Sequence, residues 1–145
     1  MNKEIVNKEI MDTSALDDIP LALPALTRAQ KLQSHAANEG FDWRHVNSVF
    51  DKLNEEILEL KQAISNNNKH EIEDEMGDCL FTLVNLARHL DVDADSCLRL
   101  GASKFERRFR LVEMHHQQNN QKISDSSDEE LEALWQQIKT EVVKK

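Results

Sequence analysis

The sequence predicts an all-α protein, a helix bundle of about five helices. Its 145 residues include 3 Gly, 2 Pro and no Tyr, and they are rich in the helix formers Leu, Ala, Glu, Gln and Lys. Apolar residues recur every three or four positions through most of the chain, and short polar segments separate these stretches. A chain of this length suits one domain, which we expect over residues 19–145 behind a flexible N-terminal tail at residues 1–18.

Five stretches carry the helical pattern, and specific residues mark their ends. We expect helices at residues 26–38, 44–65, 70–90 and 94–118, and a last one that begins near residue 127. Gly40 suits a position just after a helix C-terminus. The polar run 65–68 is too short for anything but an antiparallel return. Residues 127–130, Ser-Asp-Glu-Glu, form a capping box that opens the last helix.

The second and third helices each carry an apolar stripe, and the third has more apolar residues than one stripe holds. The stripes comprise Leu53, Ile57, Leu60 and Ile64 on one helix and Ile72, Met76, Cys79 and Leu83 on the other. The expected buried side of the first of these helices also includes Val46, Val49 and Phe50. Between residues 79 and 90 the third helix is apolar on more than one face. This excess predicts a second contact surface, most simply another copy of the chain, so we expect the bundle to be completed as a homodimer or higher homo-oligomer.

Composition and charge exclude several classes of partner. No apolar run approaches the ~20 residues that span a bilayer, and the N-terminus lacks the apolar region of a signal peptide, so we expect a cytoplasmic protein without membrane contact. The net charge of -9 argues against binding a nucleic-acid polymer. It does not exclude a nucleotide, because metal ions that accompany phosphates reverse the local field. Cys79 and Cys97 have no CxxC spacing and fall on apolar helical positions, so they are expected to be reduced core residues.

Two acidic pairs flank the polar turn between the second and third helices. Glu56 and Glu59 lie three residues apart on one side of a helix, as do Glu75 and Asp78. At 100° per residue each pair lies about 60° and about 120° from its apolar stripe, with the same hand. A charge so near a seam is costly unless a cation offsets it, although solvated acidic faces are common. Oxygen ligands without Cys or His favour Mg2+ or Mn2+, and such a site is typical of phosphoryl chemistry.

The acids also form a recognisable motif. Glu55-Glu56-x-x-Glu59 followed by Glu75-x-x-Asp78 resembles the EExxE…ExxD signature of the all-α nucleoside triphosphate pyrophosphohydrolases, and above all the C-terminal catalytic domain of MazG. The resemblance covers about residues 19–139. It includes Leu23-Pro24-Ala25-Leu26, Gly40-Phe41-Asp42-Trp43, Asn85-Leu86-Ala87-Arg88-His89, Lys104-Phe105-Glu106-Arg107-Arg108-Phe109 and Trp135-Gln136-Gln137.

This resemblance implies a reaction and a set of residues for it. The reaction is Mg2+-dependent hydrolysis of nucleoside triphosphates, non-standard or deoxy forms included, to the monophosphate and pyrophosphate, with Mn2+ as a substitute metal. By resemblance the metal ligands are Glu56, Glu59, Glu75 and Asp78, the catalytic group is Glu55, Glu56 and Lys52, and the substrate-binding residues are Lys52, Lys104, Arg108 and Trp135. Glu55 would orient a ligand or water, and Lys52 would touch the phosphates.

Other interpretations of these residues stay open at this point. Lys52 can pair with Glu55 or Glu56 on the helix surface, Lys104 and Arg108 can pair with acids, and Trp135 can serve packing alone. Two other functions also fit the sequence. One is a dUTP, dCTP or phosphoribosyl-ATP hydrolase of the same superfamily, and the other is a helical dimerisation module without catalysis. The sequence does not determine the preferred base or sugar.

Overall fold

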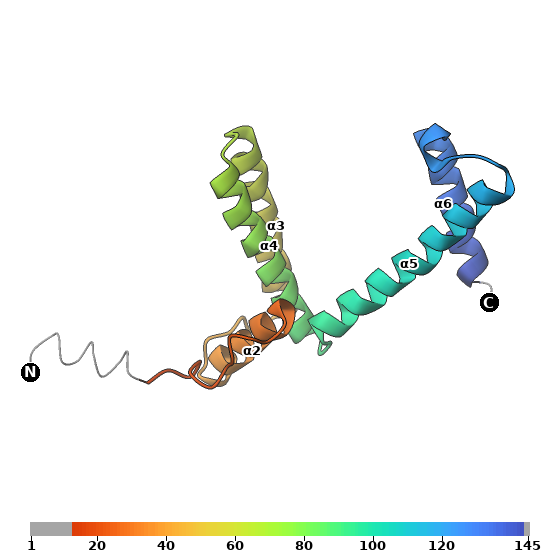
Figure 1. The fold of residues 1–145 in the computed structure, drawn as a ribbon. Helices are drawn as coiled ribbons and strands as arrows, with labels where there is room; N and C mark the ends of the chain where they lie inside the picture. The colour runs from red at the N-terminus through yellow and green to blue at the C-terminus, as the bar shows by residue number, and fades with distance from the viewer. Residues whose placement is uncertain (1–12, 144–145) are drawn as a thin grey trace, which may run out of the picture. The chain divides into compact units, whose positions relative to one another are not determined.

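The structure, a computed structural model, describes residues 13–143, with side chains through residue 141 (Figure 1). This part of the chain holds five α-helices, one short 3-10 helix and no strand, which confirms the all-α prediction. The elements are α2 (Ala25–Asn38), α3 (Val46–Ser65), α4 (Lys69–His89), α5 (Ala94–Gln118), η1 (Ile123–Asp125) and α6 (Asp128–Val143). Every predicted helix end agrees within two residues. None of the described helices combines the length and apolar character needed to cross a membrane.

The chain divides into two compact units, Met1–Cys97 and Leu98–Lys145. The organisation expected from the sequence, a tail at residues 1–18 followed by one domain at residues 19–145, stays a prediction. Positions 1–12 of that tail lie outside the described residues. The backbone from Ser14 onward forms turns, in which Asp17 N donates to Ser14 O at 3.1 Å, and a ring nitrogen of His35 lies 3.0 Å from Ala15 O.

In the first unit α3 and α4 lie side by side and antiparallel, as the short polar turn predicts (Figure 1). Asn67 has φ of 51°, a left-handed conformation that Asn adopts more easily than most residues. Asn68 then caps α4, because its side-chain oxygen accepts from the backbone N–H groups of His70 and Glu71 at 3.1 and 3.2 Å. Local polar chemistry therefore ends one helix and begins the next.

Helix α2 packs against α4 and ends at Asn38, two residues before Gly40. Gln33 Nε2 donates to Phe81 O at 2.9 Å, which ties α2 to the middle of α4. Gln30 Nε2 donates to Val92 O and Gln30 Oε1 accepts from Ala94 N, which ties α2 to the segment after α4. Gly40 has φ of +94°, where a side chain would be strained. This confirms the glycine prediction.

The seam between α3 and α4 differs from the predicted apolar stripes. Val49, Glu56 and Ala63, spaced seven residues apart, are the buried row of α3, and Cys79, Thr82 and Val84 are the buried residues of α4. Of the predicted stripe residues, Ile57, Ile64, Met76 and Leu83 are exposed, at 38%, 57%, 44% and 47%. The prediction was wrong for these four and for Phe50, which is 45% exposed, whereas Val49 and Cys79 are buried as predicted. Apart from Glu56, the buried residues of the two helices are small, and bulkier apolar residues are exposed.

The second unit is built on contacts between the C-terminal part of α5 and α6. Phe105 lies 5.7 Å from Trp135 between ring centroids and stacks on Phe109 at 6.0 Å. His116 is buried and satisfied, because Nδ1 donates to Val112 O and Nε2 accepts from the Ser126 hydroxyl at 2.7 Å. The predicted capping box is present: Ser127 Oγ accepts from Glu130 N at 3.1 Å and lies 3.2 Å from the Glu130 carboxylate.

Candidate metal centre

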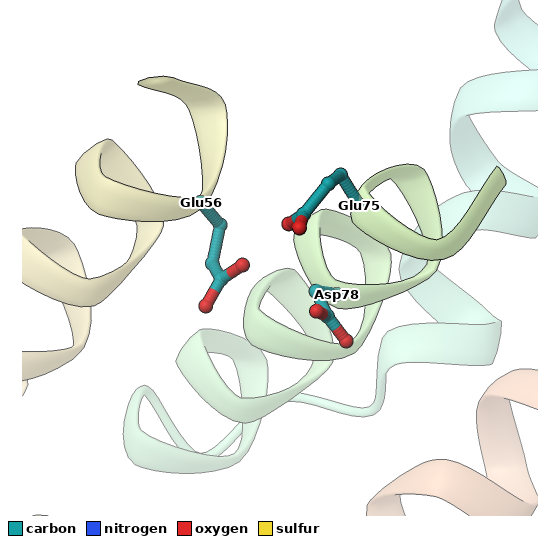
Figure 2. A group of neighbouring side chains, drawn as sticks. All are labelled: Glu56, Glu75 and Asp78. Carbon is teal, nitrogen blue, oxygen red and sulfur yellow. The ribbon is translucent and has the colours of Figure 1, made fainter. Parts of the chain in front are cut away.

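Three of the predicted metal ligands come together between α3 and α4. Glu56 of α3 and Glu75 and Asp78 of α4 each offer a carboxylate oxygen, and these oxygens all lie within 4.8 Å of one another (Figure 2). Glu56 is 5% exposed because it belongs to the buried row of α3, whereas Asp78 is exposed. The antiparallel hairpin therefore converts two separate sequence motifs into one acidic group.

Crowding of the acids changes their ionisation. Removal from water and then the neighbouring Glu59 carboxylate raise the pKa of Glu75 to about 7. Removal from water and then Glu56 raise the pKa of Asp78. Glu59 is exposed and is not one of the three mutually close acids, but it lies against Glu75. Its role as a fourth ligand stays a prediction.

The donor set fits a hard divalent cation. Glu56 Oε2 and Glu75 Oε2 are buried and have no hydrogen-bond partner among the described residues. A buried carboxylate oxygen without a partner is unfavourable, and a cation satisfies it directly. Burial and then Glu56 raise the pKa of the neighbouring Cys79, so the nearest thiol is kept protonated rather than available as a thiolate ligand. Carboxylate oxygens without a thiolate suit Mg2+ or Mn2+ better than Zn2+.

Lys52 contacts the acidic group directly. Its Nζ lies 2.9 Å from both Glu56 Oε1 and Glu55 Oε2. Hydrogen bonds to Glu56 and then Glu55 raise the pKa of Lys52, so it stays protonated. The side chain of Glu55 is 61% exposed, whereas that of Glu56 is 6% exposed. The surface pairing that the sequence allowed is therefore present, and contact of Lys52 with phosphates stays a prediction.

The other predicted substrate-binding residues lie in the second unit. Arg108 places its guanidinium carbon 6.0 Å from the centre of the Trp135 ring, and Arg108 Nε is buried without a hydrogen-bond partner in the described part of the chain. Lys104 is exposed. Glu106, which is two residues from both Lys104 and Arg108 and so lies on another side of the helix, pairs with Arg110 at 2.8 Å. Trp135 packs on Phe105, as the packing interpretation predicts, and nucleotide contact by these residues stays a prediction.

The first unit contains a cavity that the sequence pattern does not predict. It has a volume of about 550 Å³, and α2, the loop after it, α3 and α4 all contribute to its walls. The lining includes Gln33, Phe41, Trp43, Lys52, Phe81 and Asn85. The Gly40-Phe41-Asp42-Trp43 segment was visible in the sequence, but nothing in its local pattern assigns it to a wall beside α4.

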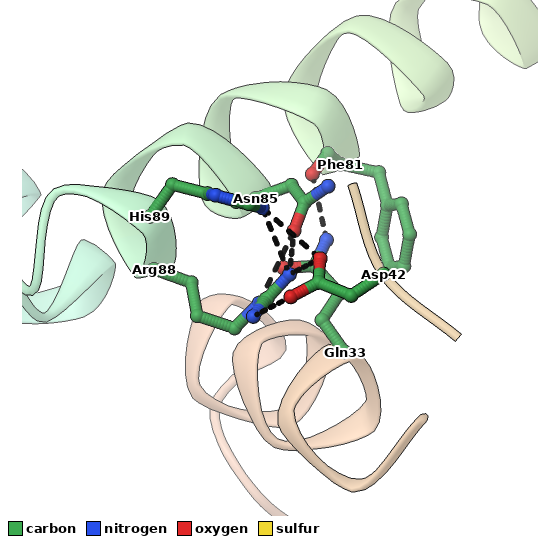
Figure 3. A network of polar contacts seen from close by, with 6 residues as sticks. All are labelled: Gln33, Asp42, Phe81, Asn85, Arg88 and His89. Atoms are coloured by element: carbon green, nitrogen blue, oxygen red, sulfur yellow. Dashed lines mark hydrogen bonds and ion pairs between the residues drawn. The ribbon is translucent and has the colours of Figure 1, made fainter. Parts of the chain in front are cut away.

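Three polar residues of the cavity lining, Asp42, Asn85 and Arg88, form a hydrogen-bonded network that also includes His89 (Figure 3). Arg88 Nη1 donates to Asp42 Oδ2 at 3.0 Å, and Arg88 Nη2 also contacts Asp42 Oδ1. The same guanidinium donates to Asn85 Oδ1, and His89 Nε2 lies 3.0 Å from Asp42 Oδ1. The hydrogen bond from Arg88 is the main cause that lowers the pKa of Asp42. The loop after α2 is thereby fastened to the C-terminal part of α4.

Comparison with known proteins bears on this site. Residues 44–112, which carry Glu55, Glu56, Glu59, Glu75 and Asp78, match the MazG nucleotide pyrophosphohydrolase domain. The chain is 47% identical over 134 residues to the nucleoside triphosphate pyrophosphohydrolase of Escherichia coli (strain K12), covering 90% of this chain and 50% of that protein. It is 36% identical over 127 residues to the nucleoside triphosphate pyrophosphohydrolase/pyrophosphatase MazG of Thermotoga maritima, covering 88% of this chain and 49% of that protein.

The chain thus spans about half the length of the curated relatives that it matches. The identity extends beyond the acidic motif to nine tenths of this chain, and the fold brings the acids of the motif together. Residues 44–112 therefore form a MazG nucleotide pyrophosphohydrolase domain, as the resemblance of the motifs predicts.

Proposed function

We propose that the protein hydrolyses nucleoside triphosphates to the nucleoside monophosphate and pyrophosphate, with Mg2+ as its metal and Mn2+ as a substitute. The observation that carries the proposal is the group of Glu56, Glu75 and Asp78 between two helices, two of whose carboxylates have a buried oxygen without a partner. Chains related to this one over most of its length carry the names nucleoside triphosphate pyrophosphohydrolase and MazG.

In this proposal Glu56, Glu59, Glu75 and Asp78 hold the ion, which when bound supplies positive charge to the phosphates and lowers the pKa of water. The oxygen of a water molecule forms a bond to phosphorus, the anhydride bond between the α and β phosphates breaks, and the proton that the water loses passes to solvent. Glu55 is the acid that orients this water, since its side chain is solvent-exposed beside Glu56. The pyrophosphate oxygens take the negative charge that the broken bond releases.

The chain's own cations complete the proposed phosphate site. Lys52 already lies 2.9 Å from Glu56, so a phosphate held at the acids would meet its ammonium group. Lys104 and Arg108 are four residues apart on α5, hence on one side of that helix, and would offset the remaining charge. Trp135 lies against the nucleotide in this proposal, together with the Arg108 guanidinium that it contacts.

A second copy of the chain is part of the proposed assembly. Large apolar side chains on α3 and α4 are exposed, among them Leu58 at 64%, Ile64 at 57% and Leu80 at 51%. Apolar patches of this kind mark protein contact surfaces. The partner that fits such a surface most simply is another copy, as a homodimer or larger homo-oligomer. Both cysteines are free, in keeping with a reducing compartment such as the cytoplasm. Cys79 is buried as expected of a core residue, but Cys97 is exposed, so the core expectation was wrong for Cys97.

A nucleotide panel tests the proposed activity. Standard, deoxy and non-standard triphosphates are incubated with protein and Mg2+, and pyrophosphate release and the second product are measured. We expect release from at least one triphosphate, and a loss of about 100-fold or more in Asp78→Ala and Glu59→Ala, which remove ligands. Glu73→Ala, an exposed change on the same helix as Asp78, should retain the parent rate.

Each negative outcome has a distinct meaning. If Asp78→Ala and Glu59→Ala release pyrophosphate at the parent rate, the metal assignment is wrong. If no triphosphate is hydrolysed, calorimetric titration with Mg2+ and a non-hydrolysable triphosphate separates a nucleotide-binding protein from an interaction module. A bare helical module gives no saturable, metal-dependent heat.

A further inference from the structure

The cavity of the first unit lies beside the acidic group. Lys52 lines the cavity and contacts Glu56, and Thr82, which also lines it, donates its hydroxyl to Asp78 O at 2.8 Å. The volume of about 550 Å³ falls within the range of small-molecule sites. A ligand seated in the cavity is therefore in reach of both Lys52 and the helical turn that carries a metal ligand.

The walls of the cavity suit a flat aromatic ring. Phe41, Trp43 and Phe81 contribute aromatic surface, with 81%, 46% and 47% of each residue exposed. An aromatic side chain so exposed contributes little to a core, and base rings stack on such surfaces with little dependence on sequence. These residues come from the loop after α2 and from α4.

One buried acceptor in the wall lacks a donor. Gln33 is 7% exposed, and its Nε2 donates to Phe81 O at 2.9 Å, which fixes the orientation of the amide (Figure 3). Gln33 Oε1 is buried and accepts no hydrogen bond from any residue that the structure describes. Reversing the amide would place Oε1 against the carbonyl oxygen of Phe81, so that two acceptors would face each other without a proton between them. The contact with Phe81 therefore fixes Oε1, an acceptor, as the atom without a partner. A ligand in the cavity that carries an N–H or O–H donor would therefore satisfy this acceptor.

A second polar group has a fixed direction in the same wall. Asn85 Oδ1 accepts from Arg88 Nε at 3.2 Å and from Arg88 Nη2 at 2.7 Å, which leaves the Asn85 NH2 group as the donor. Asp42 in turn holds the Arg88 guanidinium (Figure 3). An acceptor at Gln33 and a donor at Asn85, set among aromatic walls, match the edge of a nucleobase, which presents N–H donors next to acceptor atoms.

We propose that this cavity is the base subsite, and that Gln33 is a specificity-determining residue that accepts an N–H from the edge of the base. This inference rests on the proposed function, because the base enters joined to the phosphates that Lys52 and the acids hold. Gln33 selects against bases that present only an acceptor at this position, since two acceptors would then face each other without a proton.

Gln33→Met tests this subsite, with Gln30→Met as the matched control. Met keeps the length of the side chain and removes the acceptor. Gln30 lies on the same helix and its amide makes two structural hydrogen bonds, but it does not line the cavity. We expect Gln33→Met to raise KM for the best nucleotide about tenfold with kcat unchanged, because the base edge is bound equally in the ground and transition states. Gln30→Met should leave KM at the parent value.

The inhibition constant of inorganic tripolyphosphate, which has no base, supplies a second readout. It should be the same in parent and Gln33→Met, since only base contact is lost. A substrate analogue methylated at its N–H donor should be discriminated by the parent and not by Gln33→Met. Equal KM values for parent and variant, or an equal loss for tripolyphosphate and nucleotide, would overturn the assignment.

If Gln33→Met does not fold, Phe41→Ala provides a second test of the base subsite. Phe41 is 81% exposed, so its removal should leave the circular dichroism spectrum and Tm unchanged while raising KM about tenfold through lost stacking. Leu21→Ala, at a residue 85% exposed and outside the cavity lining, is the control. An unchanged KM in Phe41→Ala would contradict the assignment of the cavity as the base subsite.

Failure of the proposed function is distinguishable from failure of this inference. If the parent hydrolyses no triphosphate, titration with nucleoside monophosphates in the absence of metal still measures the subsite. Binding by the parent that weakens about tenfold in both Gln33→Met and Phe41→Ala supports the subsite without the activity. Binding that neither substitution weakens, or no binding at all, overturns it.

Discussion

Lys52 and Glu56 lie one helical turn apart on α3, with Lys52 Nζ 2.9 Å from Glu56 Oε1. A cationic side chain of the protein thus touches the most deeply buried of the three clustered acids. Two roles compete for this lysine. It either offsets the charge of Glu56 for stability alone, or it also binds the phosphates of the substrate.

Lys52→Met separates these roles. We expect KM for nucleoside triphosphates to rise about tenfold, because a phosphate contact is lost. We also expect the affinity for Mg2+ alone to rise several-fold, because a positive charge that competes for Glu56 is removed. Initial rates and calorimetry measure the two effects. Lys61→Met, an exposed lysine on the same helix, is the control. A lower Tm without a change in either KM or Mg2+ affinity would leave Lys52 with the structural role only.

Glu75→Gln should stabilise the metal-free protein and abolish its response to metal. Three carboxylates within 4.8 Å repel one another, and a neutral amide of the same shape relieves this repulsion. We expect the metal-free Tm to rise by about 2–4 °C. The further rise on adding Mg2+, expected for the parent, should disappear because a ligand is lost. Scanning calorimetry with and without Mg2+ measures both. Glu73→Gln, exposed on the same helix, should behave as the parent.

Asp42→Asn should lower stability near neutral pH and lose this effect in acid. The hydrogen bond from Arg88 lowers the pKa of Asp42 in the folded state, so the unfolded chain binds the proton more readily. The pair therefore stabilises the fold fully above the unfolded pKa of about 3.9 and progressively less as pH falls below it toward the folded pKa. We expect a loss of about 1 kcal/mol at pH 7, since both side chains are partly exposed.

Urea unfolding of parent and Asp42→Asn at pH 7 and at pH 3 checks this pH dependence. The difference between the two proteins should shrink at the lower pH. Comparing the difference, rather than the parent alone, removes the opposite contribution of Glu75, whose raised pKa favours the fold in acid. A difference that is constant or grows in acid would contradict the assigned direction.

Arg108→Met and Lys104→Met should each raise KM for nucleoside triphosphates about tenfold with little change in Tm. Lys104 is exposed, and Arg108 Nε has no hydrogen-bond partner within the described residues. We therefore expect neither substitution to cost much folding stability. Arg110→Met is the matched control on the same helix, because Arg110 pairs with Glu106 and its side chain is 71% exposed. Equal KM values for all three variants would remove α5 from the proposed phosphate site.

Leu80→Glu should reduce the molecular mass measured by light scattering. Leu80 is 51% exposed on α4, amid the apolar residues that a second copy would cover, and a buried charge there costs several kcal/mol of association. Leu21→Glu, at an exposed leucine outside the α3–α4 hairpin, should leave the mass unchanged. A parent protein that is already monomeric would refute the proposed assembly.

The helices and the acidic motif were predictable from short-range chemistry. The turn at Asn67 and Asn68, the glycine at position 40 and the capping box at Ser127 each act on neighbouring residues, so their effect can be inferred from a few positions. The spacing of Glu56 to Glu59 and of Glu75 to Asp78 likewise fixes the side of each helix that the acids occupy. The family resemblance was carried by the same residues and by further short motifs.

Only the tertiary structure decided which helix row forms the seam and what lies beside the acids. The apolar pattern predicted the burial of Val49 but also favoured Ile57 and Ile64, whereas the buried row continues from Val49 to Glu56 and Ala63. Which row is buried depends on how the side chains of two helices fit together, and this is a tertiary property. The cavity depends on pairs such as Gln33 with Phe81 and Asp42 with Arg88, which are 48 and 46 residues apart. No local pattern encodes such pairs. The sequence by itself determined the helices and the acids that they carry. The packing of helices against one another determined which oxygens of the described residues are buried without a hydrogen-bond partner, and these are the oxygens that we propose bind a cation and a base.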